Sequence, residues 1–227
     1  MDRGPALSQP TEPAAPVERV LPLVVRIERA DPPTRTDALE AAALAVLRLL
    51  IAPREEWAPA IAEWNGRRIR KVVRRARGAE WARAAELDGL TVEHGTAQVR
   101  VFPPIPLDQW PRDLARLQVS GTELADPSPP AAPEPGTPVL WLSPHQPMTA
   151  GKAMAQVGHA AQLGWRASTG TQRAQWIDAG LPLAVRAADE ATWAAALSAG
   201  LPLVRDGGFT EVEPGAQTAI ADLPWLR

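Results

Sequence analysis

A proline-rich segment near the middle of the chain limits the fold more than any other feature. Six of the thirteen residues at 126–138 are proline, which fixes φ and has no backbone N–H to donate. Such a stretch forms a semi-rigid linker instead of a helix or a central strand. We therefore expect a disordered tail at 1–17, a first folded unit at 18–125, the linker at 126–138 and a second unit at 139–227.

Composition indicates a globular protein with a packed core, because 45% of the 227 residues are hydrophobic and 22% are charged. The absence of cysteine excludes a disulfide framework and thiol catalysis, and fits a cytoplasmic location. No apolar run approaches the roughly 20 residues of a membrane span, and none resembles a signal peptide. Three scattered histidines predict no metal site, and we expect no cofactor.

Strand and helix patterns alternate along the second unit. We expect strands at 139–142, 181–186, 203–204 and 217–221, and helices at 149–165 and 189–199, the first of them N-capped by Thr149. This order predicts an α/β fold, with a small mixed four-stranded sheet flanked by helices on both faces.

The first unit can be laid over the second. Three matches carry this alignment: residues 23–26 with 140–143, Val73-Arg74 before Trp81 with Val185-Arg186 before Trp193 at the same spacing, and 93–95 with 213–215. Chance similarity between Ala-rich helices would explain part of the match. We expect the fold to be present twice, as a tandem pseudo-dimer within a monomeric chain; a further homodimer stays open.

The helix expected at 149–165 has a polar stripe. Lys152, Gln156 and His159 are spaced i, i+4 and i+7, so they share one helix face. Lys152 lies near the helix start, where we expect free N–H groups and the positive end of the dipole to favour an anion or an oxyanion. Spacing alone fits a solvent-facing helix edge equally well, and His159 could instead cap a local carbonyl.

The literal sequence is more specific than the spacing. Residues 151–160 read Gly-Lys-x-x-Ala-Gln-x-x-His-Ala, which resembles the pattern of the type 2 peptidyl-tRNA hydrolases. Residues 203–224 resemble the closing segment of that family, Asp-x-Gly-x-Thr before a Pro-Gly turn. The residues in register there are Asp206, Gly208, Thr210, Pro214, Gly215 and Thr218. The resemblance covers the second unit alone.

This resemblance implies hydrolysis of the ester between a peptide and the 3′ ribose of tRNA, with no metal or covalent intermediate. The resemblance implies that Lys152 stabilises negative charge on the oxyanion or on a phosphate, and that Asp206 orients or activates water. Gln156, His159 and Thr210 would complete the catalytic site as hydrogen-bonding partners. Asp206, which precedes two glycines, is also an ordinary turn residue.

The chain departs from the family pattern in two places. Ser143 and His145 stand where a basic and an acidic residue are usual after the first strand, and Pro147 stands where lysine is common. In the first unit, Arg35, Leu39 and Ala42 replace the three residues of the polar stripe. We therefore expect the first unit to be catalytically silent.

The segment 67–83 contains eight basic residues and one acidic residue, in a chain whose formal net charge is −2. It is either a solvated basic face or a phosphate-binding patch. We expect Arg26, Arg70, Lys71 and Arg74 to contact the partner, peptidyl-tRNA. Two alternatives stay open: a non-catalytic RNA-binding or assembly module on the same fold, and an esterase acting on another acyl conjugate.

Overall fold

The structure is a computed structural model that describes residues 17–51, 54–66 and 69–227. The tail expected at 1–17 falls outside the described residues except for Val17, and so do Arg67 and Arg68 of the basic segment.

The first unit forms a mixed five-stranded sheet. Its elements are β1 (Arg19–Arg26), α1 (Arg35–Ile51), η1 (Glu55–Trp57), α2 (Ala58–Asn65), β2 (Arg70–Ala76), α3 (Gly78–Glu86), β3 (Leu90–His94), β4 (Ala97–Val101), β5 (Ile105–Pro106) and α4 (Arg112–Ala115). The strand order is β2-β1-β4-β3, and the short β5 pairs with β1. Strands β1 and β2 are parallel, whereas β4 runs antiparallel to both of its neighbours.

The second unit repeats this pattern. Its elements are β6 (Val139–Leu142), α5 (Ala150–Ala167), α6 (Gly170–Asp178), β7 (Ala184–Ala187), α7 (Glu190–Ser198), β8 (Leu203–Arg205), β9 (Gln217–Asp222) and η2 (Pro224–Leu226). The order is β7-β6-β9-β8, with β6 and β7 parallel and β9 antiparallel to its neighbours. The segment 126–138 between the units contains no helix or strand.

The registers of the two sheets agree with the sequence alignment of the units. Leu23 pairs with Val73 in the first sheet, and Leu140 pairs with Val185 in the second. The prediction of an α/β fold with two mixed sheets is therefore confirmed. The first sheet differs from the expected four strands because β5 is added beside β1.

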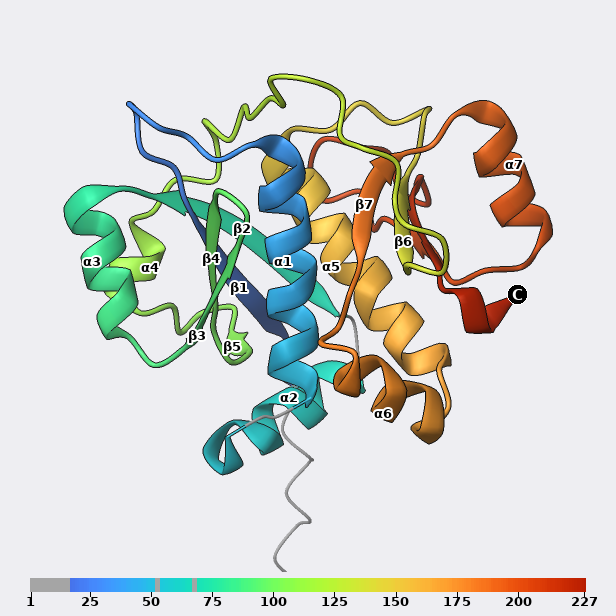
Figure 1. Cartoon of the computed structure of the whole chain (residues 1–227). Coiled ribbons are helices and arrows are strands. Elements are labelled where there is room, and N and C mark those ends of the chain that lie inside the picture. Colours follow the sequence, from blue (N-terminus) through green and yellow to red (C-terminus); the bar gives the residue numbers. More distant parts are fainter. Residues whose placement is uncertain (1–16, 52–53, 67–68) are drawn as a thin grey trace, which may run out of the picture.

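Helices α1 and α5 lie side by side between the two sheets (Figure 1). One continuous core contains residues of both sheets, among them Leu23 and Val99 from the first and Leu140 and Ala219 from the second. Helices α3 and α4 pack on the outer face of the first sheet and α7 on the outer face of the second. Each sheet thus has helices on both faces.

The composition of α1 explains its central position. Every residue from Ala38 to Leu47 is buried, and a helix that is apolar on all sides is typical of a protein interior. Five of these residues are alanines. Their small side chains let α5 and the sheets approach closely from several directions.

Within the described residues, no helix combines the length and the apolar character needed to cross a membrane.

Two local features differ from the sequence expectation. Strand β7 begins at Ala184, so the expected start at 181 is wrong. Leu181 has a φ of 60°, and its N–H bonds to the carbonyl of Trp176. This hydrogen bond ends the preceding helix α6. The prediction did not include α6. Its signal is a capping box, in which Thr169 and Gln172 bond each other's backbone N–H groups.

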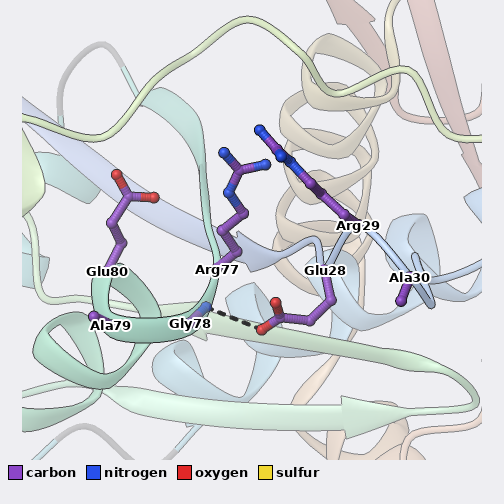
Figure 2. A pocket seen from close by; sticks show the side chains of 7 residues that line it. All are labelled: Glu28, Arg29, Ala30, Arg77, Gly78, Ala79 and Glu80. Atoms are coloured by element: carbon purple, nitrogen blue, oxygen red, sulfur yellow. Dashed lines mark hydrogen bonds between the residues drawn. The ribbon is translucent and has the colours of Figure 1, made fainter.

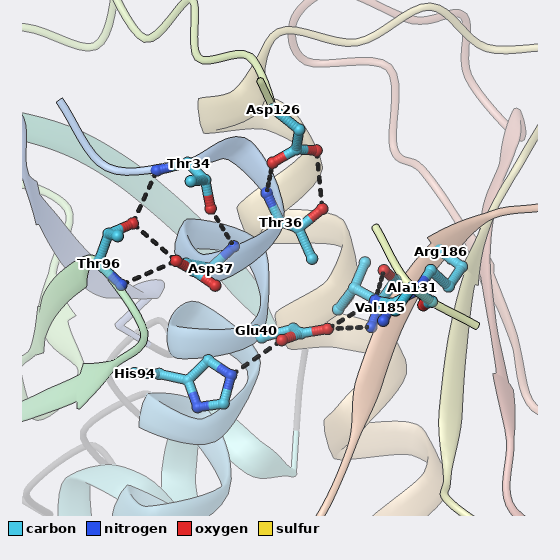
Figure 3. A network of polar contacts seen from close by, with 10 residues as sticks. All are labelled: Thr34, Thr36, Asp37, Glu40, His94, Thr96, Asp126, Ala131, Val185 and Arg186. Atoms are coloured by element: carbon cyan, nitrogen blue, oxygen red, sulfur yellow. Dashed lines mark hydrogen bonds and ion pairs between the residues drawn. The ribbon is translucent and has the colours of Figure 1, made fainter. Parts of the chain in front are cut away.

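A buried carboxylate connects the units (Figure 3). Glu40 of α1 accepts hydrogen bonds at Oε1 from the backbone N–H of Val185 at 3.0 Å and from Nη1 of Arg186 at 2.8 Å. Its Oε2 lies 2.9 Å from Nε2 of His94. Because β7 is an edge strand, Glu40 pairs an N–H group that the sheet itself leaves without a partner.

The same region brings three potential metal ligands together. Asp37, Glu40 and His94 offer ligand atoms within 4.8 Å of one another. Both oxygens of Glu40 are already bonded, one of them to the cation Arg186, and Asp37 accepts hydrogen bonds from Thr96. We therefore describe this group as an ion-paired network.

Replacing Glu40 by alanine is expected to lower the free energy of unfolding by about 3 kcal/mol, because the buried Val185 N–H would lose its acceptor and Arg186 would lose its carboxylate partner. Urea denaturation followed by tryptophan fluorescence would measure the loss. Glu80→Ala, on the exposed side of α3, is the matched control and should change stability by less than about 0.5 kcal/mol. An equal effect of the two substitutions would contradict the role of Glu40.

Candidate active site

The two segments that carry the family resemblance meet in space. Nζ of Lys152 on α5 lies 2.7 Å from Oδ2 of Asp206, which follows β8. The two side chains are only 8% and 10% exposed, so this ion pair is shielded from bulk water more than a surface pair would be. The structure therefore places a cation and a carboxylate at one point of the second unit.

Gln156 joins this pair to the sheet. Its Nε2 donates to Oδ2 of Asp206 at 2.8 Å, and its Oε1 accepts from the hydroxyl of Thr218 at 2.6 Å. Gln156 and Thr218 are 2% and 0% exposed. Because the amide oxygen faces a donor and the amide nitrogen faces an acceptor, the orientation of the Gln156 side chain is fixed.

The two carboxylate oxygens of Asp206 have different partners. Its Oδ1 accepts the backbone N–H of Gly208 at 2.8 Å in a local turn, and Gly208 has a φ of 73°. The other oxygen, Oδ2, faces Lys152 and Gln156. The turn thus orients one carboxylate oxygen toward the site.

Thr210 completes the cluster from the same loop. Its hydroxyl accepts a hydrogen bond from Nζ of Lys152 at 3.0 Å. The preceding residue, Phe209, is 59% exposed, and its ring lies under the guanidinium of Arg70, 3.9 Å from the ring centroid. Arg70 belongs to β2, so the first unit contacts the loop that carries Thr210.

The start of α5 is less open than the sequence predicts. Thr149 accepts the N–H of Lys152 at 3.3 Å and is itself bonded to Glu211, while the N–H of Gly151 donates to the hydroxyl of Thr122 at 3.0 Å. The expectation of free N–H groups is wrong for these two residues. A Cβ atom at position 151 would lie 2.8 Å from the Thr122 hydroxyl, which explains the glycine there.

His159 has different partners from Lys152 and Gln156. Its Nδ1 lies 3.1 Å from Nζ of Lys71 on β2. Lys71 is 8% exposed and also donates to Oε1 of Gln162 at 2.6 Å. The structure places Lys71, which we expected to bind tRNA, between the units, where it is largely shielded from solvent.

Arg74 is also engaged within the protein. Its guanidinium lies 4.5 Å from the ring centroid of Trp110 and donates to the carbonyls of Ala115 and Leu117. Burial lowers the pKa of Arg74 below its usual range.

The other two predicted tRNA contacts lie at opposite ends of the first sheet. Arg70 pairs with Val20 near the start of β1, whereas Arg26 ends β1 opposite Ala76. Six residues of extended chain separate these levels, which is roughly 20 Å. Arg26 bonds Glu28 and Gln98, and Arg70 lies 3.0 Å from a carboxylate oxygen of Glu18. The four residues do not form one continuous basic surface.

A surface pocket lies at the carboxyl ends of β1 and β2 (Figure 2). It is lined by Glu28, Arg29, Ala30, Arg77, Gly78, Ala79 and Glu80. Oε1 of Glu28 accepts the N–H of Gly78 at the start of α3, and this hydrogen bond, with that from Arg26, lowers the pKa of Glu28. The anion position at this helix end is thus taken by the protein's own carboxylate.

Thr218→Val is expected to lower the free energy of unfolding by about 1–3 kcal/mol, because the buried oxygen of Gln156 would lose its donor. Thr218→Ser keeps the hydroxyl and should restore most of the loss. Chemical denaturation of both variants would measure the difference. Equal stability of the valine variant and the wild type would show that the Gln156 amide is held by other contacts.

A scan of the sequence against models of known protein families finds no match. The resemblance to type 2 peptidyl-tRNA hydrolases therefore rests on the two motifs themselves and on their meeting at Lys152 and Asp206.

Proposed function

We propose that this protein hydrolyses the ester bond between a peptide, or an N-blocked amino acid, and tRNA in the cytoplasm, and so releases tRNA for reuse. The observation that carries the proposal is the Lys152–Asp206 ion pair, because it joins the two motifs of the resemblance in one shielded site. The reaction needs no metal or cofactor on this proposal.

Each residue of the site has a chemical role in this reaction. Asp206 orients a water molecule and accepts its proton as the water oxygen bonds to the ester carbonyl carbon. Lys152 stabilises the negative charge that develops on the carbonyl oxygen. The bond to the 3′ oxygen of the ribose then breaks, and that oxygen takes up a proton, giving a free acid and a free tRNA.

The hydrogen-bonding capacity of Lys152 supports this assignment. An ammonium group has three N–H donors, of which one faces Asp206 and one faces Thr210. The third donor is left for a substrate oxygen. Gln156 and Thr210 hold the two charged groups in place, so little reorganisation is needed when the oxyanion forms.

Substrate contact is proposed on the side where the first unit meets this loop. The exposed ring of Phe209 and the guanidinium of Arg70 lie beside Thr210, and unpaired bases at the end of a nucleic acid stack on such groups. Arg70 is therefore the predicted tRNA contact that we retain at the site.

A second candidate is a non-catalytic RNA-binding or assembly module on the same fold. It is favoured by the loop after β6, where the buried Ser143 and the segment up to Pro147 provide no lysine or arginine. An esterase acting on another acyl conjugate would use the same site residues.

Hydrolysis of N-acetyl-aminoacyl-tRNA by the purified protein tests the proposal. Lys152→Ala and Asp206→Asn are each expected to lower kcat/KM by roughly 10²–10³-fold, the usual loss when a preorganised group of the oxyanion site is removed. The matched controls are Arg116→Ala and Glu213→Gln, which change exposed charges just after α4 and on the β8–β9 loop, and both should keep wild-type activity.

The outcomes distinguish the hydrolase from the RNA-binding module and test the location of the site. Absence of release by the wild type would exclude the peptidyl-tRNA hydrolase. Binding of the tRNA without release would favour the RNA-binding module. Release that survives both site substitutions would keep the activity and move its site elsewhere.

A further inference from the structure

Lys71 is a buried amine with an unusual set of neighbours. Its Nζ lies 3.1 Å from Nδ1 of His159, donates to Oε1 of Gln162 at 2.6 Å, and lies 4.8 Å from the centre of the Trp64 ring. Among the described residues, no carboxylate forms an ion pair with Lys71. The energetic reason for a lysine here is therefore not a salt bridge.

The protein is built to accommodate this side chain. A Cβ atom at Gly158 would lie 3.3 Å from Cδ of Lys71 and 3.1 Å from a methyl of Val46, so the glycine leaves room for the lysine stem beside α5. Nε2 of Gln162 donates to Oδ1 of Asn65 at 2.6 Å, which turns the amide oxygen toward Lys71. Both contacts fix the position of Nζ.

His159 is held on one side only. Its Nδ1 faces Lys71, whereas the part of the chain that the structure describes gives Nε2 no hydrogen-bond partner, and the ring is partly exposed. His159 lies on α5 two turns beyond Lys152 and on the same face. Its Nε2 is thus the ring atom available to a substrate bound along this face.

We propose that Lys71 of the first unit is a positioning residue for the site in the second unit: by donating a hydrogen bond to Nδ1 it holds His159 as the Nε2–H tautomer. This inference deepens the proposed function, because it concerns the same site. It makes His159 a hydrogen-bond donor to the substrate and leaves the role of base to Asp206.

The electrostatics of the pair agree with this direction of the hydrogen bond. Two cations 3.1 Å apart in the interior repel each other strongly, so the pair carries one positive charge at most. An ammonium group donates hydrogen bonds and accepts none, so Nδ1 accepts when that charge is on Lys71.

The charged groups that act on His159 are all cations. Burial lowers the pKa of His159 well below its usual value, and Lys71 on β2 with Lys152 and Arg166 on α5 lower it further. Burial, with a smaller effect of Arg166, also lowers the pKa of Lys71 well below its usual range. Burial and the neighbouring cations therefore both favour the uncharged form of His159.

The use of lysine in this chain is consistent with the assignment. Only Lys71 and Lys152 are lysines among 24 basic residues. Arginine does not lose its proton in proteins and presents a wide planar donor group. A compact amine fits the space beside Gly158 and directs a single N–H at the imidazole.

The tautomer can be observed directly by NMR, because the chain has three histidines. Long-range ¹H–¹⁵N spectra of the uniformly labelled full chain distinguish a protonated nitrogen from an unprotonated one, and the spectrum of His159→Gln assigns the His159 signals. We expect wild-type His159 to carry its proton on Nε2 at neutral pH. A proton on Nδ1 would overturn the proposal, and this measurement does not depend on any variant at Lys71 or on hydrolysis.

Lys71→Met tests the cause. Methionine keeps most of the apolar stem, so we expect His159 to show both tautomers and to titrate closer to its ordinary pKa. Arg75→Met on the same strand, where the arginine bonds Ser120 and Gln118, is the matched control and should leave the His159 signals unchanged. An unchanged tautomer and titration in Lys71→Met would overturn the proposal.

The same variant links the tautomer to the reaction. With N-acetyl-aminoacyl-tRNA as substrate, Lys71→Met is expected to lower kcat by about 10- to 100-fold, since small misplacements of a site group have effects of this size, while KM changes little. Full activity of Lys71→Met would overturn the positioning role. Failure of the wild type to hydrolyse this substrate would reject the proposed function, and the NMR result would still decide the contact between Lys71 and His159.

Discussion

The contact between α1 and α5 is the interaction on which the rest of the structure depends. Both helices are buried over most of their length, and the core that they share contains side chains from both sheets. Hydrophobic burial is the main favourable contribution to folding. Neither unit can bury its central helix on all sides alone, because α1 needs α5 as a neighbour and α5 needs α1. The two halves of the chain therefore stabilise each other through one interior.

This packing brings the edge strand of each sheet against the central helix of the other unit. Strand β7 meets α1, where Glu40 pairs the Val185 N–H and Arg186. Strand β2 meets α5, where Lys71 reaches His159 and Gln162. An edge strand presents unpaired backbone groups that invite aggregation, and covering it removes this risk. The polar side chains in these two places are buried but bonded, as groups in an interior must be.

The sequence predicts features that depend on neighbouring residues and does not reveal the contacts between the two units. Alternating strands and helices, the N-cap at Thr149 and the polar spacing of Lys152 and Gln156 depend on neighbouring residues, so the pattern reveals them. The pairing of the two motifs required the family resemblance as well, because nothing in the spacing alone joins 152 to 206. The burial of Lys71 and the internal contacts of Arg74 could not be predicted, because a run of basic residues looks the same whether it faces water or the protein. The contact of Thr122 with Gly151 has no sequence signal, since the partners come from different units.

The asymmetry between the units follows from one loop. In the first unit β3 and β4 are joined by the tight turn at Gly95 and Thr96, and Asp37 fills the space above it, within 2.5 Å of where a Cβ of Gly95 would lie. In the second unit the segment 206–216 takes that place and supplies the carboxylate and the hydroxyl that face Lys152. A short turn cannot reach over the helix, so the first unit has no room for an equivalent site. Its helix instead carries Glu40 toward the second unit, and its edge strand carries Lys71. The first unit thus supports the second one, through the contacts that hold α5 and the residues along it in place.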